Sequence, residues 1–310
     1  MEPAAGGYFR DVYTGLVRQP DGYRRRRFLD GELETAAAHL TELKPLRSRE
    51  RIPAQGHYAI DDEQLWRMTR MYALSRISDY LLESACPDGL VPAGFGVTGG
   101  RRIDPGALSV HTEFLSGIGL TPFELGDSFS PFHHEMFAVV TDDHAAAVTV
   151  EEVLWPGLWF GDLLFSRAGV RVRAPRHLID AAATTTSPLY FTFRRHPRRT
   201  KDPSYGGDAD SQWGTRFPRF YSDAEGLHLN WDGRTDIGAD PPESPDGITG
   251  PDAERSLPRR RELLLNRCFV RLPRPIDHDR WCPFDGRMSV TTSAWPLPEG
   301  SIVHPAWRRR

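Results

Sequence analysis

The fold of this chain depends on residues 135–172, which read EMFAVVTDDHAAAVTVEEVLWPGLWFGDLLFSRAGVRV. Residues 135–140 and 146–153 have the apolar and β-branched content of strands, and the polar Asp142-Asp143-His144 between them could turn a hairpin. The aromatic and apolar residues that follow, up to Val172, are typical of a buried core. Taken alone, this stretch favours strands over helices.

Upstream of this stretch the sequence predicts helices. Residues 61–84 carry apolar side chains at spacings of three to five, namely Leu65, Met68, Tyr72, Ile77 and Leu81. Asp61 and Gln64 resemble a capping box at the start of this helix, and residues 31–43 form a second, shorter helix with one apolar face. Residues 91–131 are dense in glycine and proline, so we expect only short and interrupted regular structure there.

The composition indicates a folded protein that acts on a small molecule. The chain has 310 residues, so we expect one domain over residues 1–310, with a mobile surface loop at residues 236–259, which hold five prolines and no aromatic residue. A net charge of −3 gives no reason to expect nucleic-acid binding. No run approaches the roughly 20 apolar residues of a membrane helix. Three widely spaced cysteines favour a reducing compartment, so we expect a cytoplasmic protein.

The segment most suggestive of chemistry is residues 189–200, which read LYFTFRRHPRRT. A heme site needs an axial donor, flat apolar walls and cations for the propionates, and this segment supplies all three types of residue. His196 is the donor, and Arg194, Arg195 and Arg199 are the cations. The alternative is a strand that leaves the core and enters a basic surface turn.

Residues 189–200, together with Ser211-Gln212-Trp213-x-Thr215, resemble the heme-dependent tyrosine hydroxylases of actinobacteria. Members of that family open propylproline-type pathways to lincosamide, pyrrolobenzodiazepine and hormaomycin antibiotics. The resemblance covers residues 131–233. The Gly-Trp-Gly run expected from the family is absent, and residues 205–210, which read YGGDAD, are found in its place.

The resemblance implies a mainly α fold with a minor β component, rich in loops and related to tryptophan 2,3-dioxygenase. We therefore expect helix to prevail even in residues 135–172. The resemblance further implies a heme b ligated by His196, and ortho-hydroxylation of L-tyrosine to 3,4-dihydroxyphenylalanine by hydrogen peroxide. A distal base would move a proton, and His133 or His134 is our candidate for it.

Residues 210–217 interleave hydrogen-bonding and aromatic side chains, as a pocket for an amino acid would. Ser211, Gln212 and Arg216 are our candidates for substrate binding, with Arg216 pairing with a carboxylate. The same residues also describe an ordinary capped helix start. The many aromatic residues leave open whether they line a cofactor cavity or a homodimer interface.

Two other classes of function remain open. His133, Glu135 and His144 could together bind non-heme iron, because two histidines and a carboxylate form the facial triad of iron oxygenases. Adjacent strand residues point to opposite faces, so His133 and His134 could not both be ligands on a regular strand. A non-catalytic protein that binds a small molecule is the third reading.

Overall fold

The computed structural model describes residues 7–47, 62–86 and 103–179, apart from 125 and 131, and the backbones of five short strands further along the chain. Four α-helices come first in the described residues. They are α1 (Gly7–Val17), α2 (Gly22–Glu42), α3 (Asp62–Ser84) and α4 (Pro105–Gly117), with a 3₁₀ turn, η1 (Lys44–Arg47), after α2. None of the helices in these ranges has both the length and the hydropathy of a membrane-spanning segment.

The helix ends follow local capping chemistry. The Asp21 carboxylate accepts a hydrogen bond from the Arg24 amide at the start of α2. At the start of α4, Asp104 accepts hydrogen bonds from the amides of Gly106 and Ala107, and Pro105 takes the first helical position. Gly119, just past α4, has a φ of 113° that L side chains rarely adopt.

The predicted helix at 61–84 is confirmed as α3, and the one at 31–43 forms the second half of the longer α2. The expectation of only short structure in residues 91–131 is wrong, because α4 occupies 13 of them. The Asp104-Pro105 pair that starts this helix is a recognisable signal in the sequence, but the many glycines around it led to the expectation of a loop.

The strands form two sheets in the described residues. The smaller sheet has the order β2 (His134–Thr141), β6 (Ala168–Ala174), β3 (Thr149–Trp155). The larger has the order β1 (Thr121–Phe123), β4 (Gly157–Phe160), β5 (Leu163–Ser166), β9 (Val270–Pro273), β8 (Gly226–Leu229), β7 (Arg219–Ser222), β10 (Met288–Val290), β11 (Ile302–Val303). Strands β4 and β5 are joined by a two-residue turn in which Gly161 has a φ of 62°.

The expected mainly α fold related to tryptophan 2,3-dioxygenase is wrong. Residues 134–174 contain five strands, β2 to β6, and the described chain is a mixed α and β structure. The local β-branched and aromatic content therefore prevailed over the helical expectation that came from the resemblance. Strands were correctly predicted at residues 135–140 and 146–153, which correspond to β2 and β3.

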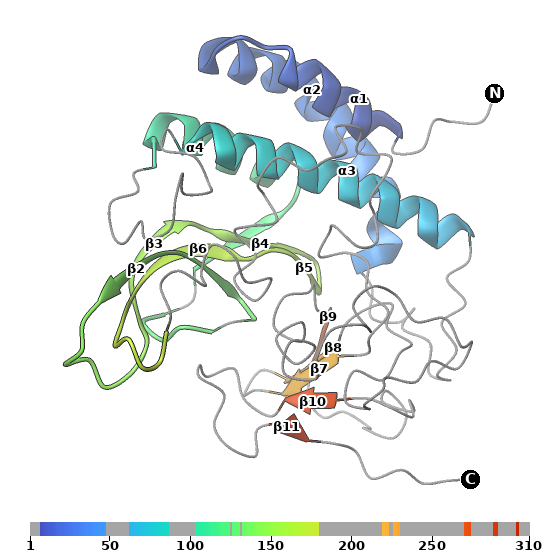
Figure 1. The fold of residues 1–310 in the computed structure, drawn as a ribbon. Coiled ribbons are helices and arrows are strands. Elements are labelled where there is room, and N and C mark those ends of the chain that lie inside the picture. The colour runs from blue at the N-terminus through green and yellow to red at the C-terminus, as the bar shows by residue number, and fades with distance from the viewer. Residues whose placement is uncertain are drawn as a thin grey trace, which may run out of the picture.

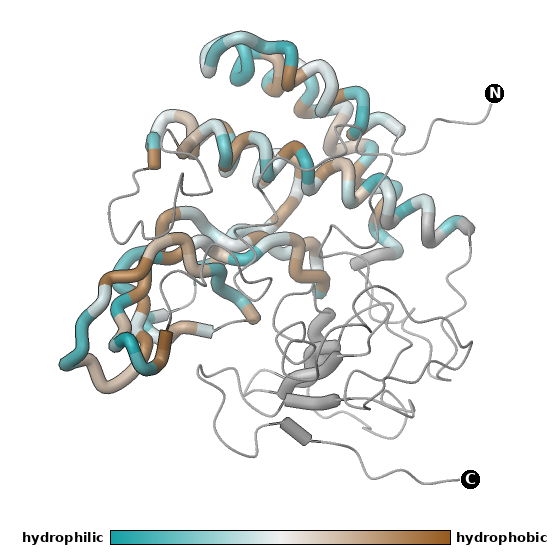
Figure 2. The backbone as a smooth tube through the Cα atoms, viewed as in Figure 1, coloured by the Kyte–Doolittle hydropathy of each residue, from teal (hydrophilic) through white to brown (hydrophobic). Residues whose placement is uncertain are grey.

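The expected hairpin between β2 and β3 is also wrong, because β6 lies between them. Strand β6 pairs parallel with β2 and antiparallel with β3. Ion pairs hold the intervening turn against the end of β6, since Arg173 contacts both Asp142 and Glu151, and Arg176 contacts Asp143. Figure 2 shows the tip of the smaller sheet as a hydrophilic stretch followed by a moderately hydrophobic one.

The helices and the larger sheet share one hydrophobic core. In Figure 1, α3 and α4 lie between the sheets on one side and α1 and α2 on the other. Buried residues of all four helices form one cluster with Leu158, Trp159, Phe160 and residues 163–165 of β4 and β5. This confirms that the aromatic stretch around residue 158 is core.

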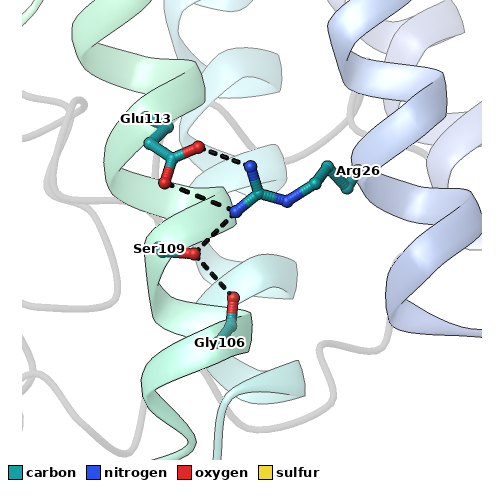
Figure 3. A network of polar contacts seen from close by, with 4 residues as sticks. All are labelled: Arg26, Gly106, Ser109 and Glu113. Carbon is teal, nitrogen blue, oxygen red and sulfur yellow. Dashed lines mark hydrogen bonds and ion pairs between the residues drawn. The ribbon is translucent and has the colours of Figure 1, made fainter.

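Polar contacts within and between the helices lie both inside this core and at its surface. The middle of α3, residues 71–79, is buried on every side, including the Arg76–Asp79 pair at 3.1 Å. Ser78 Oγ lies 2.9 Å from His111 Nε2 and so connects α3 with α4. Arg26 of α2 binds Glu113 of α4 through both of its terminal nitrogens (Figure 3). Residues 24–27 are four consecutive arginines, and Arg26 is one of them that joins two helices.

Candidate functional site

The two histidines that the sequence singled out lie in a tight turn closed by Ser130. The Ser130 carbonyl accepts hydrogen bonds from the amides of His133, at 3.2 Å, and His134, at 2.8 Å. The Ser130 amide donates to His134 Nδ1 at 2.9 Å. The Ser130 hydroxyl lies 3.0 Å from His133 Nδ1. One serine therefore contacts both imidazole rings, one through its main chain and the other through its side chain.

The turn is anchored to the start of two parallel strands. The His133 carbonyl accepts a hydrogen bond of 2.9 Å from the Ala168 amide, and His134 is the register partner of Ala168. Strand β2 begins only at His134, so His133 belongs to the turn and the alternation of a strand does not govern where its ring points. The two rings consequently have different surroundings.

Aromatic side chains lie next to both rings. The His133 ring centroid lies 6.0 Å from that of Trp159 on β4 and 6.1 Å from that of Phe123 on β1. The His134 ring lies 5.8 Å from that of Phe129. The side chain of His133 is 4% exposed and that of His134 is 2% exposed. The rings are therefore largely withdrawn from bulk water.

A glycine in β4, Gly157, leaves room for the phenyl ring of Phe123. A Cβ placed at Gly157 would lie 2.2 Å from Phe123 Cζ, so the phenyl ring rests directly on the glycine backbone. Phe123 and Gly157 are register partners in the β1–β4 pair. Any side chain at this position would push the ring that faces His133 out of place.

Two buried charged side chains flank the turn along the chain. Glu135 follows His134 on β2 and is 1% exposed, and Arg167 precedes Ala168 and is 2% exposed. Burying a charge is costly unless the fold compensates for it. Ser130, His133, His134, Glu135 and Arg167 all lie at or next to the point where β2 and β6 begin, and we call these five residues the β2–β6 cluster.

The structure does not assemble the proposed iron triad. His144 is exposed and lies beyond the far end of β2, a strand whose length is roughly 23 Å at 3.3 Å per residue. His133 and Glu135 lie at the opposite end of this strand. In the part of the chain that the structure describes, no group of three histidine, cysteine, aspartate or glutamate side chains is placed to hold a metal ion.

The remaining predicted site residues lie outside the described ranges. They comprise the implied heme ligand His196, the arginines Arg194, Arg195 and Arg199, and the substrate candidates Ser211, Gln212 and Arg216. The loop expected at 236–259 also lies outside these ranges.

The described residues supply one feature that a heme or aromatic-substrate site also needs, namely aromatic side chains next to an imidazole. The rings of Trp159 and Phe123 lie beside His133 and also contact each other, at a centroid distance of 5.5 Å.

The sequence reasoning missed three members of this site. Ser130 lies only three residues before His133, and serines at such spacing commonly bond to nearby backbone or side chains, so a local signal existed. Trp159 and Phe123 come from other strands and carried no local signal. Comparison with known proteins gives no further guidance, because no protein-family model, no curated protein and no solved structure matches this chain.

Proposed function

We propose that this chain is an enzyme in which His133 is the acid–base residue, and that it hydroxylates a phenol, L-tyrosine, with hydrogen peroxide at a heme held by His196. The observation that carries the proposal is the buried Ser130–His133 pair, whose imidazole ring packs beside the contacting rings of Trp159 and Phe123. The local resemblance of residues 189–200 supports the heme and tyrosine parts. The β2–β6 cluster supports the acid–base part.

His133 is preferred over His134 because of what each Nδ1 contacts. The His133 Nδ1 faces a hydroxyl, which can donate or accept, so this ring can change its protonation state without losing its partner. The His134 Nδ1 faces a main-chain N–H, which can only donate. A residue that exchanges protons during a reaction needs the first kind of partner.

The chemistry assigned to His133 is proton transfer at Nε2. With Nδ1–H directed to the Ser130 hydroxyl, Nε2 carries a lone pair that can take the proton of the phenol hydroxyl and later return it. When bound, a heme would supply the oxidising chemistry. In the overall reaction one peroxide oxygen enters an aromatic C–H bond and the other leaves as water. The burial of His133 keeps bulk solvent from the transferred proton.

The first experiment is an absorption spectrum of the full chain produced with added heme precursor, followed by titration with L-tyrosine. We expect an intense Soret band that shifts when tyrosine binds, and loss of that band in His196→Ala. A colourless protein that also fails to bind added hemin would overturn the heme and hydroxylase parts of the proposal.

A second experiment addresses the acid–base part. His133→Gln should keep the Soret band and lower kcat by about 10²- to 10⁴-fold, the usual contribution of a general acid–base residue. His144→Gln, which changes an exposed histidine at the far end of β2, is the matched control and should leave activity unchanged. Full activity in His133→Gln would refute the role of His133.

A further inference from the structure

We infer that Ser130 is a positioning residue whose contacts treat the two adjacent histidines differently: its amide fixes His134 as the Nε2–H tautomer, whereas its hydroxyl can pair with His133 in either tautomer. The structural part of this inference stands on geometry alone. Its consequence for catalysis rests on the proposed function.

The arrangement at His134 follows from the identity of its donor. A main-chain N–H always carries its hydrogen, so the 2.9 Å contact from the Ser130 amide requires a lone pair on His134 Nδ1. A neutral imidazole has a single ring proton, which must then be on Nε2. The opposite ring orientation would place a carbon at this point and leave a buried amide without its acceptor. The turn thus selects both the ring orientation and the tautomer.

The arrangement at His133 differs because its partner is a hydroxyl. Ser130 Oγ can accept from Nδ1–H or donate to a bare Nδ1, so the 3.0 Å contact is kept in either tautomer and also in the protonated ring. The contact restrains the ring position without specifying where the proton is. The Ser130 carbonyl accepts both histidine amides, so the same residue also fixes the backbone from which the two rings project.

This division has a chemical consequence for the β2–β6 cluster. His134 can donate from Nε2 but cannot take a second proton at Nδ1 while the Ser130 amide occupies that atom. It is therefore excluded as the base, and its Nε2 lacks the lone pair that a metal ligand needs. Two histidines that are equivalent by sequence are made different by the residue that closes their turn.

The test uses ¹⁵N NMR of the imidazole nitrogens in the full-length chain at neutral pH, with Ser130→Ala, which removes the hydroxyl but keeps the amide. In the unaltered protein, His134 should show a proton-bearing Nε2 and an acceptor Nδ1. Ser130→Ala should leave this pattern unchanged, while the His133 Nδ1 signal shifts because its hydroxyl partner is lost. Ser130→Thr, which restores a hydroxyl, should return the His133 signals to their original positions.

A proton on His134 Nδ1, or no change at His133 in Ser130→Ala, would overturn the inference. The functional readout is separate. In the active protein, Ser130→Ala should lower kcat by up to about tenfold with little change in KM, since one hydrogen bond that orients the base is lost. Loss through KM alone would contradict a positioning role. Because the NMR patterns need no activity, failure of the proposed function and failure of this inference are distinguishable.

Discussion

Replacing Gly169 by alanine is the sharpest perturbation that the structure offers for the smaller sheet. Gly169 of β6 is the register partner of Trp155 of β3, and a Cβ at Gly169 would lie 2.0 Å from Cε2 and 2.2 Å from Cζ2 of the indole. Trp155 is 1% exposed and contacts the Phe137 ring at a centroid distance of 5.2 Å, so it has little room to retreat. The indole and the new methyl group cannot occupy the same space.

Two estimates bracket the loss of folding stability expected for Gly169→Ala. Overpacking a well-packed core typically costs about 1–3 kcal/mol. If the indole is expelled instead, losing an aromatic burial of roughly 150–250 Å² at about 25 cal/mol per Å² gives an upper bound of about 4–6 kcal/mol. Since several ring atoms of Trp155 lie well inside contact distance, we expect Gly169→Ala to destabilise the fold by about 3 kcal/mol or more.

The assay is denaturant unfolding followed by far-UV circular dichroism, with Gly31→Ala as the matched control. Gly31 lies inside α2, and a Cβ there would meet nothing within 4 Å, so this substitution should stabilise the protein by about 1 kcal/mol through helix propensity. The same chemical change should therefore have opposite signs at the two positions. A Gly169→Ala protein within about 0.5 kcal/mol of the unaltered one would refute the reasoning.

Three further outcomes are expected from the described contacts. Gly157→Ala should destabilise by about 1–3 kcal/mol, because the stacked ring blocks the new methyl group, and unfolding with denaturant checks this. Arg26 holds the pKa of Glu113 below its ordinary value, chiefly by hydrogen bonding. The stabilisation by the Arg26–Glu113 pair is therefore present above the pKa that Glu113 has in the unfolded chain. It is lost as the pH falls through the pKa of Glu113 in the folded protein. Arg26→Gln should raise the Glu113 pKa in a carboxyl NMR titration, and an unchanged value would contradict the pairing. Arg76→Met should cost about 3–5 kcal/mol by leaving Asp79 buried without its arginine, whereas Arg76→Met combined with Asp79→Leu should cost much less in the same unfolding assay.

The elements found correctly from the sequence are those whose signals are local. The apolar spacing of residues 61–84 predicted α3, and the β-branched content of residues 135–140 and 146–153 predicted β2 and β3. Periodicity and propensity act over one or two turns of helix or a few strand residues, so they can be read directly. The expectation of a mainly α fold was wrong because it was taken from the resemblance and gave less weight to the β-branched content of these residues.

The pairing of the strands was decided by tertiary structure. Strand β6 follows β3 in the chain yet lies between β2 and β3, where Arg173 bridges Asp142 and Glu151. Nothing within the 135–153 segment specifies this order, because the groups that select it come from a later strand. His144 follows the end of β2 in the turn and is exposed there, far from His133 and Glu135.

The candidate site likewise has features that the local sequence determines and others that tertiary packing determines. The sequence by itself determined that His133, His134 and Ser130 are close together, since a turn of five residues brings them into contact. Only the tertiary structure decided which histidine ring packs beside Trp159 and Phe123, because these two side chains come from β4 and β1 and meet His133 only after the sheet forms. Hydrogen bonds within a turn depend on spacing along the chain, whereas the surroundings of a ring depend on which distant surfaces pack against it.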